Sequence, residues 1–435
     1  MSADITRRHL LASAPAAAAF KPAKPALLGG PKTRTSAFGA WPVGSAGEER
    51  ALVETLRSGK WFRGSGRAVA RFEEAYAKLM GSPFCLATAN GTSALIVSLN
   101  VLGVEPGDEV ILPPYTFVAT VNAVLRQYAL PVFVDTDPET FQMDHRKAES
   151  AFSERTRAMM PVHLGGAMCD MDALLPLARK RGAALIEDAC QAHLAEWKGK
   201  KAGTLGDAGC FSFQESKNLA SGEGGAVLLA TEELIERAHA FHNNGGGRGR
   251  SGIMAEYSIA GANYRLTEFQ AALLLARMER LEKEAKIRSE NAAYLSGLLK
   301  KIPGIRPVKL HGGCTRSAWH LYMFRYDAAA FSGLARSRFL EALKAEGIPA
   351  SGGYTPLNRQ GFIRRTIQAR PYRKLFPAKA LDEWMDRNQC PANDKLCSEA
   401  VWFTQNILLG PRSDMDQIVE AVTKIQAHAG DLART

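Results

Sequence analysis

The stretch CFSFQESKNLASGEGGAVLLA, residues 210–230, places one lysine between two short apolar segments. Residues 210–213 are long enough for a buried strand, and a second apolar run resumes at Ala226 behind a Gly-Glu-Gly-Gly turn. Lys217 lies between them, beside glycines that let another group approach the backbone closely. Most lysines are solvated surface charges, but a desolvated lysine has a lowered pKa and forms Schiff bases with carbonyl compounds. The stretch therefore predicts either an ordinary loop lysine or a carbonyl-binding amine at a strand end.

Around this stretch, short apolar runs alternate with segments of helical length. The expected strands are residues 84–88, 109–113, 131–134, 158–162, 183–186, 210–213 and 226–229. Amphipathic helical stretches at 93–102, 119–128 and 172–181 separate several of them. This alternation is typical of an α/β fold, in which helices cover both faces of a mostly parallel sheet. Ligands of such sheets bind beyond the carboxyl ends of the strands.

The chain is expected to divide into a leader and two domains. The leader, residues 1–26, has paired arginines, Arg7 and Arg8, before a small-residue apolar stretch, and it resembles a twin-arginine export signal. The alternative is an alanine-rich leader that is never cleaved. We expect a large domain with an N-terminal arm over 27–285 and a smaller α+β domain over 286–435. A glycine-rich break at 243–252 and a long helical pattern at 266–302 lie near that boundary.

Composition narrows the function classes. The chain has 435 residues, 46% hydrophobic and 23% charged, which suits a globular protein of two domains. No run of about 18 uncharged apolar residues occurs, and the net charge of +11 is scattered without a nucleic-acid-binding signature. We therefore expect no membrane span, no nucleic-acid partner and no metal. Seven cysteines without a C-x-x-C pair indicate buried thiols and a cytoplasmic location, unless the leader exports the folded protein.

A carboxylate follows another expected strand. In GAALIEDACQAH, residues 182–193, four apolar residues lead into Glu187 and Asp188. A buried carboxylate beside a pyridine nitrogen keeps that nitrogen protonated, so that the ring accepts electrons. The alternative is a helix cap or a plain loop acid. The spacing alone leaves open which of the two carboxylates would fill the role.

Two further segments offer a phosphate site and a stacking ring. In CLATANGTSALIVSLNVLG, residues 85–103, Thr92 and Ser93 open an apolar helix whose free amides suit a phosphate, although such residues also cap helices in general. In PPYTFVATVNAV, residues 113–124, Phe117 follows a strand, where an aromatic ring either stacks on a flat ligand or packs in the core. Together with the lysine and the carboxylate, these groups form the set that a pyridoxal phosphate site requires.

At this point the sequence resembles the DegT/DnrJ/EryC1/StrS family of pyridoxal-phosphate-dependent aminotransferases, which act on keto-sugars and keto-cyclitols. The similar segments are GTSALIVSLNVLGVEPGDEVILPPYTFVATVNAVL, PVFVDTDPETFQMD, PVHLGGAMCDMDAL, IEDACQAH, FSFQESKNLASGEGG and GANYRLTEFQAA. The resemblance extends from about residue 28 to the C-terminus. It implies fold type I, with a mostly parallel seven-stranded sheet, and a homodimer with shared active sites.

The resemblance also implies residue roles. Lys217 would form the Schiff base and shuttle the proton, and Asp188 rather than Glu187 would face the pyridine nitrogen. The other cofactor residues would be Gly91, Thr92 and Ser212 at the phosphate, Phe117 and Gln191 at the ring, and Asn263 from the neighbouring subunit. His163 and His320 match positions near the substrate, although a lone histidine is more often structural. Relatives that carry histidine in place of the lysine dehydrate their substrate, so Lys217 indicates transamination.

Within the family, three segments are most similar to the branch of glutamine:scyllo-inosose aminotransferases and 3-amino-5-hydroxybenzoate synthase. They are GGPKTRTSAFGAWP, GGYTPLNRQ and CPANDKLCSEAVWFTQNILLG. We therefore expect amino transfer from L-glutamine or L-glutamate to a cyclic ketone such as scyllo-inosose. One alternative is a nucleotide-linked keto-sugar as acceptor, since the basic balance suits an anionic diphosphate. The other is a non-catalytic sensor or scaffold, which the intact Lys217 and Asp188 disfavour.

Overall fold

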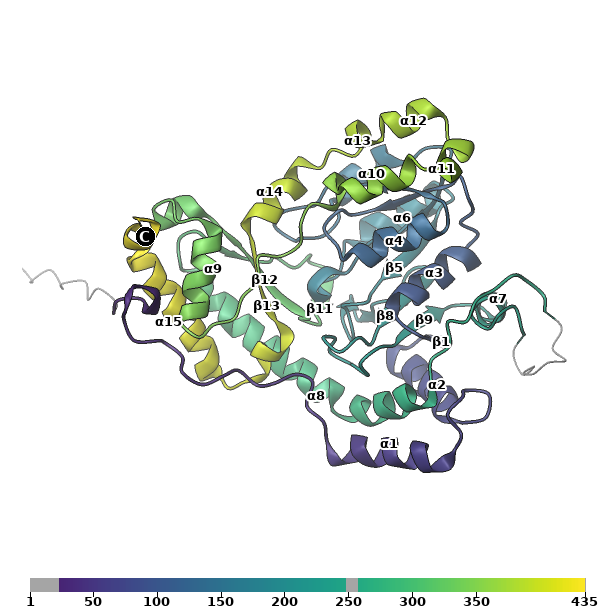
Figure 1. Ribbon diagram of the computed structural model, residues 1–435, viewed down its shortest axis with the longest axis horizontal. Helices are drawn as coiled ribbons and strands as arrows, with labels where there is room; N and C mark the ends of the chain where they lie inside the picture. The colour runs from purple at the N-terminus through teal and green to yellow at the C-terminus, as the bar shows by residue number, and fades with distance from the viewer. Residues whose placement is uncertain (1–22, 248–256, 435) are drawn as a thin grey trace, which may run out of the picture.

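The structure is a computed structural model that describes residues 23–247 and 257–434. The leader prediction, including Arg7 and Arg8, and part of the glycine-rich break lie outside these residues. Figure 1 shows two lobes, with the long helix α8 (Glu268–Leu299) running beneath both and the helix α1 (Ala46–Ser58) packed along it. Within the described part of the chain, no helix has both the length and the apolar character needed to cross a membrane.

A seven-stranded sheet forms the larger lobe, with strand order β1-β9-β8-β5-β4-β2-β3. Its strands are β1 (Phe84–Thr88), β2 (Glu109–Leu112), β3 (Leu130–Phe133), β4 (Thr156–Met159), β5 (Ala184–Asp188), β8 (Ala208–Ser212) and β9 (Gly225–Leu229). Only β9 runs antiparallel to its neighbours, because the loop 213–224 returns the chain directly beside β8. The predicted α/β architecture with a mostly parallel sheet is confirmed, and Lys217 lies in that return loop.

Helices cover both faces of this sheet, as the apolar strands require. Along β9, Ala226 and Leu228 join one buried cluster while Val227 and Leu229 join the other, because successive side chains of a strand point to opposite faces. One cluster also contains residues of α2 (Ala68–Met80), α6 (Met171–Lys180) and α8, and the other contains residues of α3 (Gly91–Val101), α4 (Val118–Arg126) and α7 (Glu232–His242). The result is a three-layer arrangement.

The smaller lobe has its own sheet, in the order β10-β12-β13. Its strands are β10 (Ile305–Pro307), β12 (Leu321–Tyr326) and β13 (Ala400–Thr404), and its helices include α9 (Arg336–Ala345), α14 (Pro391–Glu399), α15 (Arg412–Ala427) and α16 (Ala429–Arg434). A third, minor sheet was not expected from the sequence: it joins β6 (Glu196–Trp197) and β7 (Lys200–Lys201) to β11 (Cys314–Arg316). The short helix α5 (His145–Ala148) lies in the connection between β3 and β4 of the large lobe.

A segment late in the chain packs back on the large sheet. It forms the short helices α10 (Gly361–Ile367), α11 (Arg370–Leu375), α12 (Ala378–Asp382) and α13 (Trp384–Arg387). Tyr372 and Trp384 join the cluster of α3 and α4, and the Trp384 indole donates to the Pro131 carbonyl at 2.8 Å. The domain boundary expected at residue 285 lies inside α8 and stays a prediction.

An N-terminal arm makes hydrogen bonds and an ion pair with the small lobe before it reaches the large lobe. The Arg34 guanidinium pairs with Asp414 at 2.7 Å. The fully buried Glu346 carboxylate accepts hydrogen bonds from the backbone N–H of Ala26, from Thr33 and from the Lys424 ammonium. These contacts fix the start of the arm, which then continues toward the groove between the lobes.

We expect Glu346→Gln to destabilise the protein by about 3 kcal/mol, because it leaves the buried Lys424 without a charged partner. Burial raises the pKa of Glu346, but hydrogen bonds from Ala26, Lys424 and Thr33 outweigh it and hold that pKa below its ordinary value. The loss in free energy of unfolding should therefore be complete above about pH 4.3, the ordinary pKa of a glutamate. It should shrink as the pH falls through the lower pKa that Glu346 has in the folded protein. Urea unfolding at several pH values measures it, with the exposed Glu341→Gln as control. An equal deficit at every pH would contradict this account.

Candidate active site

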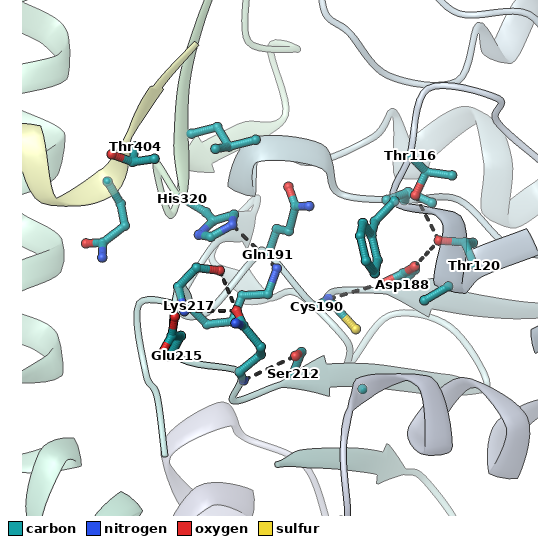
Figure 2. Close-up of a pocket in the computed structure, with 18 of the residues that line it drawn as sticks. Thr116, Thr120, Asp188, Cys190, Gln191, Ser212, Glu215, Lys217, His320 and Thr404 are labelled. Atoms are coloured by element: carbon teal, nitrogen blue, oxygen red, sulfur yellow. Dashed lines mark hydrogen bonds between the residues drawn. The ribbon is translucent and has the colours of Figure 1, made fainter. Parts of the chain in front are cut away.

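A cavity of about 890 Å³ opens between the lobes, beyond the carboxyl ends of β5 and β8. Eight of the ten residues that the sequence predicted for the site line this cavity. They are Gly91, Thr92, Phe117, Asp188, Gln191, Ser212, Lys217 and His320. Figure 2 shows Lys217, Ser212, Gln191, His320 and Asp188 around one space, with Thr404 of the small lobe facing them. Asn263 and His163 lie elsewhere.

Lys217 is a half-buried amine in the loop between β8 and β9. A turn bond from its backbone N–H to the Gln214 carbonyl, at 2.9 Å, fixes the loop at this point. Its Nζ lies 3.4 Å from Nε2 of His320, and Figure 2 shows the two side chains together. Burial lowers the pKa of Lys217, and burial likewise lowers the pKa of His320 well below its ordinary value. The site therefore holds an amine that loses its proton readily and can act as nucleophile and base.

Asp188 ends β5 and points into the cavity. Its Oδ2 accepts from the Thr120 hydroxyl at 2.8 Å, and its Oδ1 accepts from the backbone N–H of Cys190 at 3.2 Å. The Thr120 hydroxyl in turn lies 2.8 Å from that of Thr116, as Figure 2 shows. These bonds hold the carboxylate in one orientation.

Glu187 points to the opposite face of the sheet, as strand alternation demands. It accepts from the backbone N–H groups of Gly203, Leu205 and Gly206 at 2.7–2.9 Å. His163 donates from Nε2 to the same carboxylate at 2.8 Å and is fully buried. The structure thus brings Asp188 rather than Glu187 to the cavity. It does not bring His163 to the cavity, because the hydrogen bond with Glu187 holds the His163 ring on the opposite face of the sheet.

The amino end of α3 lies at the cavity. The Asn90 side chain caps the helix by accepting from Ser93 N–H at 2.8 Å, and Gly91 and Thr92 line the cavity. A Cβ at Gly91 would lie 2.7 Å from the Cβ of Ser212, so only glycine permits this approach of helix and strand. A helix amino terminus with free amides and nearby hydroxyl groups binds phosphate.

Aromatic side chains form the remaining walls. Phe117 is 56% exposed although its ring is apolar, and it lines the cavity, so a flat ligand can cover it. From the small lobe come Tyr354 and Trp402, with ring centroids 4.6 Å apart. Gln191 accepts from Gly165 N–H at 2.8 Å and donates to the Tyr354 hydroxyl at 3.1 Å. Its amide therefore positions an aromatic wall.

Several lining residues were missed by the sequence analysis. Thr116 and Thr120 are four residues apart in PPYTFVATVNAV, but Thr116 precedes α4, so helical periodicity does not signal the contact between their hydroxyls. Trp41, Tyr354, Trp402, Thr404 and Gln405 lie in the segments that served only to identify a branch of the family. Their part in the site depends on how the lobes pack, for which the sequence gives no local signal.

Asn263 is exposed and lies outside the cavity of its own chain. Its Oδ1 accepts from the backbone N–H of Arg265 at 3.3 Å, and its backbone pairs with Asn243. The expectation that Asn263 completes the site of a neighbouring subunit stays a prediction.

The cavity residues fit pyridoxal phosphate. Gly91, which tolerates no side chain, lies with Ser212 at a helix terminus suited to the phosphate. The exposed face of Phe117 suits the ring, Asp188 suits a protonated pyridine nitrogen, and the deprotonatable amine of Lys217 suits the carbonyl.

Comparison with known proteins identifies the family of the chain. The DegT/DnrJ/EryC1/StrS aminotransferase family matches residues 44–422. An L-glutamine:2-deoxy-scyllo-inosose aminotransferase of Streptoalloteichus tenebrarius is 36% identical over 424 residues, which cover 94% of this chain and 98% of the relative. The 3-amino-5-hydroxybenzoate synthase of Amycolatopsis mediterranei is 34% identical over 394 residues, covering 90% and 98%.

Solved structures give the same result. The crystal structure of 3-amino-5-hydroxybenzoic acid synthase superposes with a TM-score of 0.81 at 34% identity, covering 92% of this chain and 100% of that one. DesI, studied in the presence of its TDP-sugar product, gives 0.75 at 27% identity, covering 93% and 96%. The family and fold implied by the sequence motifs are confirmed. The chain belongs to the DegT/DnrJ/EryC1/StrS aminotransferase family and is a pyridoxal-phosphate-dependent aminotransferase.

Proposed function

We propose that this enzyme moves an amino group from L-glutamine or L-glutamate to a cyclic ketone of the keto-cyclitol class, such as scyllo-inosose. One observation carries the choice of acceptor: among the described residues that line the cavity, Lys217 is the single lysine or arginine. A nucleotide diphosphate is recognised by cationic side chains, whereas an uncharged polyhydroxylated ring needs neutral partners. The cavity offers such partners in Ser351, Tyr354, Thr404 and Asn406. The names of relatives that act on 2-deoxy-scyllo-inosose add support.

Bound in this cavity, pyridoxal phosphate supplies a carbonyl that exchanges amino groups and a ring that accepts the electrons left at a deprotonated carbon. We assign to Lys217 the transfer of the proton, from the α-carbon of the amino donor and later to the carbon of the acceptor ketone. Asp188, whose carboxylate is oriented by the Thr120 hydroxyl, would hold the proton at the pyridine nitrogen of the bound cofactor. Tyr354 and Trp402 give the cavity an apolar wall, which would limit the access of water to the reacting atoms.

We expect Lys217→Ala to lose the visible absorption band of the bound cofactor and to lower kcat by about 10²–10⁴-fold, because it removes both the covalent anchor and the base. Absorption spectra and the rate of 2-oxo acid release measure the two effects. The exposed Lys309→Ala, which is distant from the cavity lining, should change neither. A Lys217→Ala protein that kept both the band and its turnover would refute this assignment.

A second acceptor class is favoured by the similarity to DesI, which was studied with a TDP-sugar product. We expect scyllo-inosose to exceed a TDP-linked 4-keto-hexose by at least about tenfold in kcat/KM, because the described cavity lining offers the diphosphate no arginine. A panel of both ketone classes, with L-glutamine as donor and 2-oxo acid as readout, tests this. The reverse preference would overturn the choice of keto-cyclitol. The presence of both Lys217 and Asp188 in the cavity disfavours the scaffold alternative.

We also propose a homodimer in which Asn263 of each subunit completes the site of the other. Asn263 is exposed, and Tyr257 and Ile259 nearby in the chain are large hydrophobic residues with 62% and 41% exposure. Lys217→Ala and Asn263→Ala subunits should each be inactive alone, and mixing them should restore activity, because one site of the mixed dimer is then intact. Sedimentation should give twice 47.2 kDa. A mixture that stayed inactive despite forming dimers would contradict shared sites.

A further inference from the structure

The amino donor poses an electrostatic problem for this cavity. L-glutamine and L-glutamate carry an α-carboxylate, yet Lys217 is the single lysine or arginine among the described lining residues and is assigned to the cofactor. Asp188, Glu215 and Glu223 line the same cavity and repel an anion. Another donor of hydrogen bonds must therefore offset the charge of the carboxylate.

Gln405 is such a donor, and a hydrogen bond from Arg288 fixes the orientation of its side-chain amide. It begins the 3-10 helix η6 (Gln405–Leu409) directly after β13, lines the cavity and is 1% exposed. Nε of Arg288 donates to its Oε1 at 2.7 Å. A guanidinium only donates hydrogen bonds, so the oxygen of the amide must face Arg288 and the NH₂ group must face away from it. No hydrogen bond joins that NH₂ group to an acceptor among the residues that the structure describes.

Arg288 is a buried cation whose charge is only partly balanced by neighbouring groups. It is fully buried in α8, and its Nη2 lies 3.2 Å from Glu284, a carboxylate that also pairs with Arg280 at 3.0 Å. Its Nη1 is buried without a hydrogen-bond partner within the described part of the chain. Burial lowers the pKa of Arg288 to about 10. An anion on the far side of Gln405 would stabilise this cation through the amide.

The N-terminal arm closes the same corner. Trp41 lines the cavity, and its ring centroid lies 5.3 Å from Cζ of Arg288 and 5.0 Å from Cζ of Arg277. The Trp41 indole donates to the Glu215 carbonyl at 2.9 Å, which anchors the arm to the loop that carries Lys217. Both guanidinium groups lie over the Trp41 ring and are buried, so the local dielectric is low and the charge of Arg288 is felt at the far side of the Gln405 amide.

We propose that the NH₂ group of Gln405, oriented and polarised by Arg288, binds the α-carboxylate of the amino donor. The inference rests on the proposed function only in taking an amino acid as donor, and it does not depend on the acceptor ketone. Gln405 is then a substrate-binding residue and Arg288 a positioning residue. A hydrogen bond to a carboxylate is roughly twice as strong as one between neutral groups, and the cation behind the amide strengthens it further.

Gln405→Glu tests the proposal without disturbing the packing. The carboxylate keeps an acceptor for Arg288 but replaces the NH₂ donor by an oxygen that repels the substrate. In the first half-reaction of the holoenzyme, run without any ketone, the L-glutamine concentration for half-saturation should rise about 10- to 100-fold. The limiting rate should change much less. The exposed Gln389→Glu adds the same charge far from the cavity lining and should behave as wild type.

Two further readouts identify the group that Gln405 binds. Glutarate, a dicarboxylate without an amine, should bind the wild-type holoenzyme and bind Gln405→Glu about tenfold more weakly by calorimetry. A donor that lacks the α-carboxylate, 4-aminobutanamide, should lose no more than about twofold in the variant. Unchanged saturation by L-glutamine, or equal losses for both donors, would overturn the proposal. An effect confined to the KM of the ketone would reassign Gln405 to the acceptor and would also overturn it.

The role of Arg288 is tested by a double-mutant cycle. Arg288→Met removes the buried cation, a change that proteins often tolerate when the replacement packs well. It should raise half-saturation by L-glutamine, because Gln405 loses its fixed orientation, and combination with Gln405→Glu should raise it by less than the product of the single effects. Independent, multiplicative effects would show that Arg288 does not act through Gln405. Arg288→Lys, which retains a charge, should restore part of the affinity.

Discussion

The position of Asp188 beside the strand that leads to Lys217 is the constraint on which this structure depends. Asp188 pairs with Cys210 across β5 and β8, so the carboxylate and the loop that follows β8 emerge at the same edge of the sheet. The return of the chain into the antiparallel β9 confines that loop to a short path over the cavity. The rest of the fold covers this edge: α3 from one side and the small lobe from the other.

The sequence predicted a functional residue where that residue directly follows a strand that its own apolar run identifies. The strand before Lys217 and the strand before Asp188 are both continuous apolar runs, which a sheet buried on both faces requires. The choice between Glu187 and Asp188 could not be made from spacing, because neighbouring strand residues differ only in the face they point to. In the structure, three backbone N–H groups hold Glu187 on the face of the sheet away from the cavity, whereas Asp188 lines the cavity.

Contacts between distant parts of the chain were not predictable in this way. Thr120 reaches Asp188 across 68 residues, Arg288 reaches Gln405 across 117, and Gln191 reaches Tyr354 across 163. Each pair depends on how helices and lobes pack, and a single polar residue in a loop carries no periodic pattern. Residues 361–387 pack on the large sheet through side chains such as Tyr372 and Trp384, and no local pattern in the sequence signals that distant contact.

The distribution of charge links these observations to function. The described cavity lining contains one lysine and no arginine. Two buried arginines of α8, Arg277 and Arg288, lie against the Trp41 ring. Trp41 is also the point where the N-terminal arm contacts the loop of Lys217. An arginine in direct contact with the cavity would attract anions away from the amino end of α3 and would pair with Asp188. Under the proposed role of Gln405, a charge placed behind a neutral amide and an aromatic ring would act on a substrate that approaches the amide and would leave Asp188 unpaired with a cation. The arm that Glu346 and Asp414 anchor to the small lobe is therefore part of the site, because it holds the ring that keeps these cations buried.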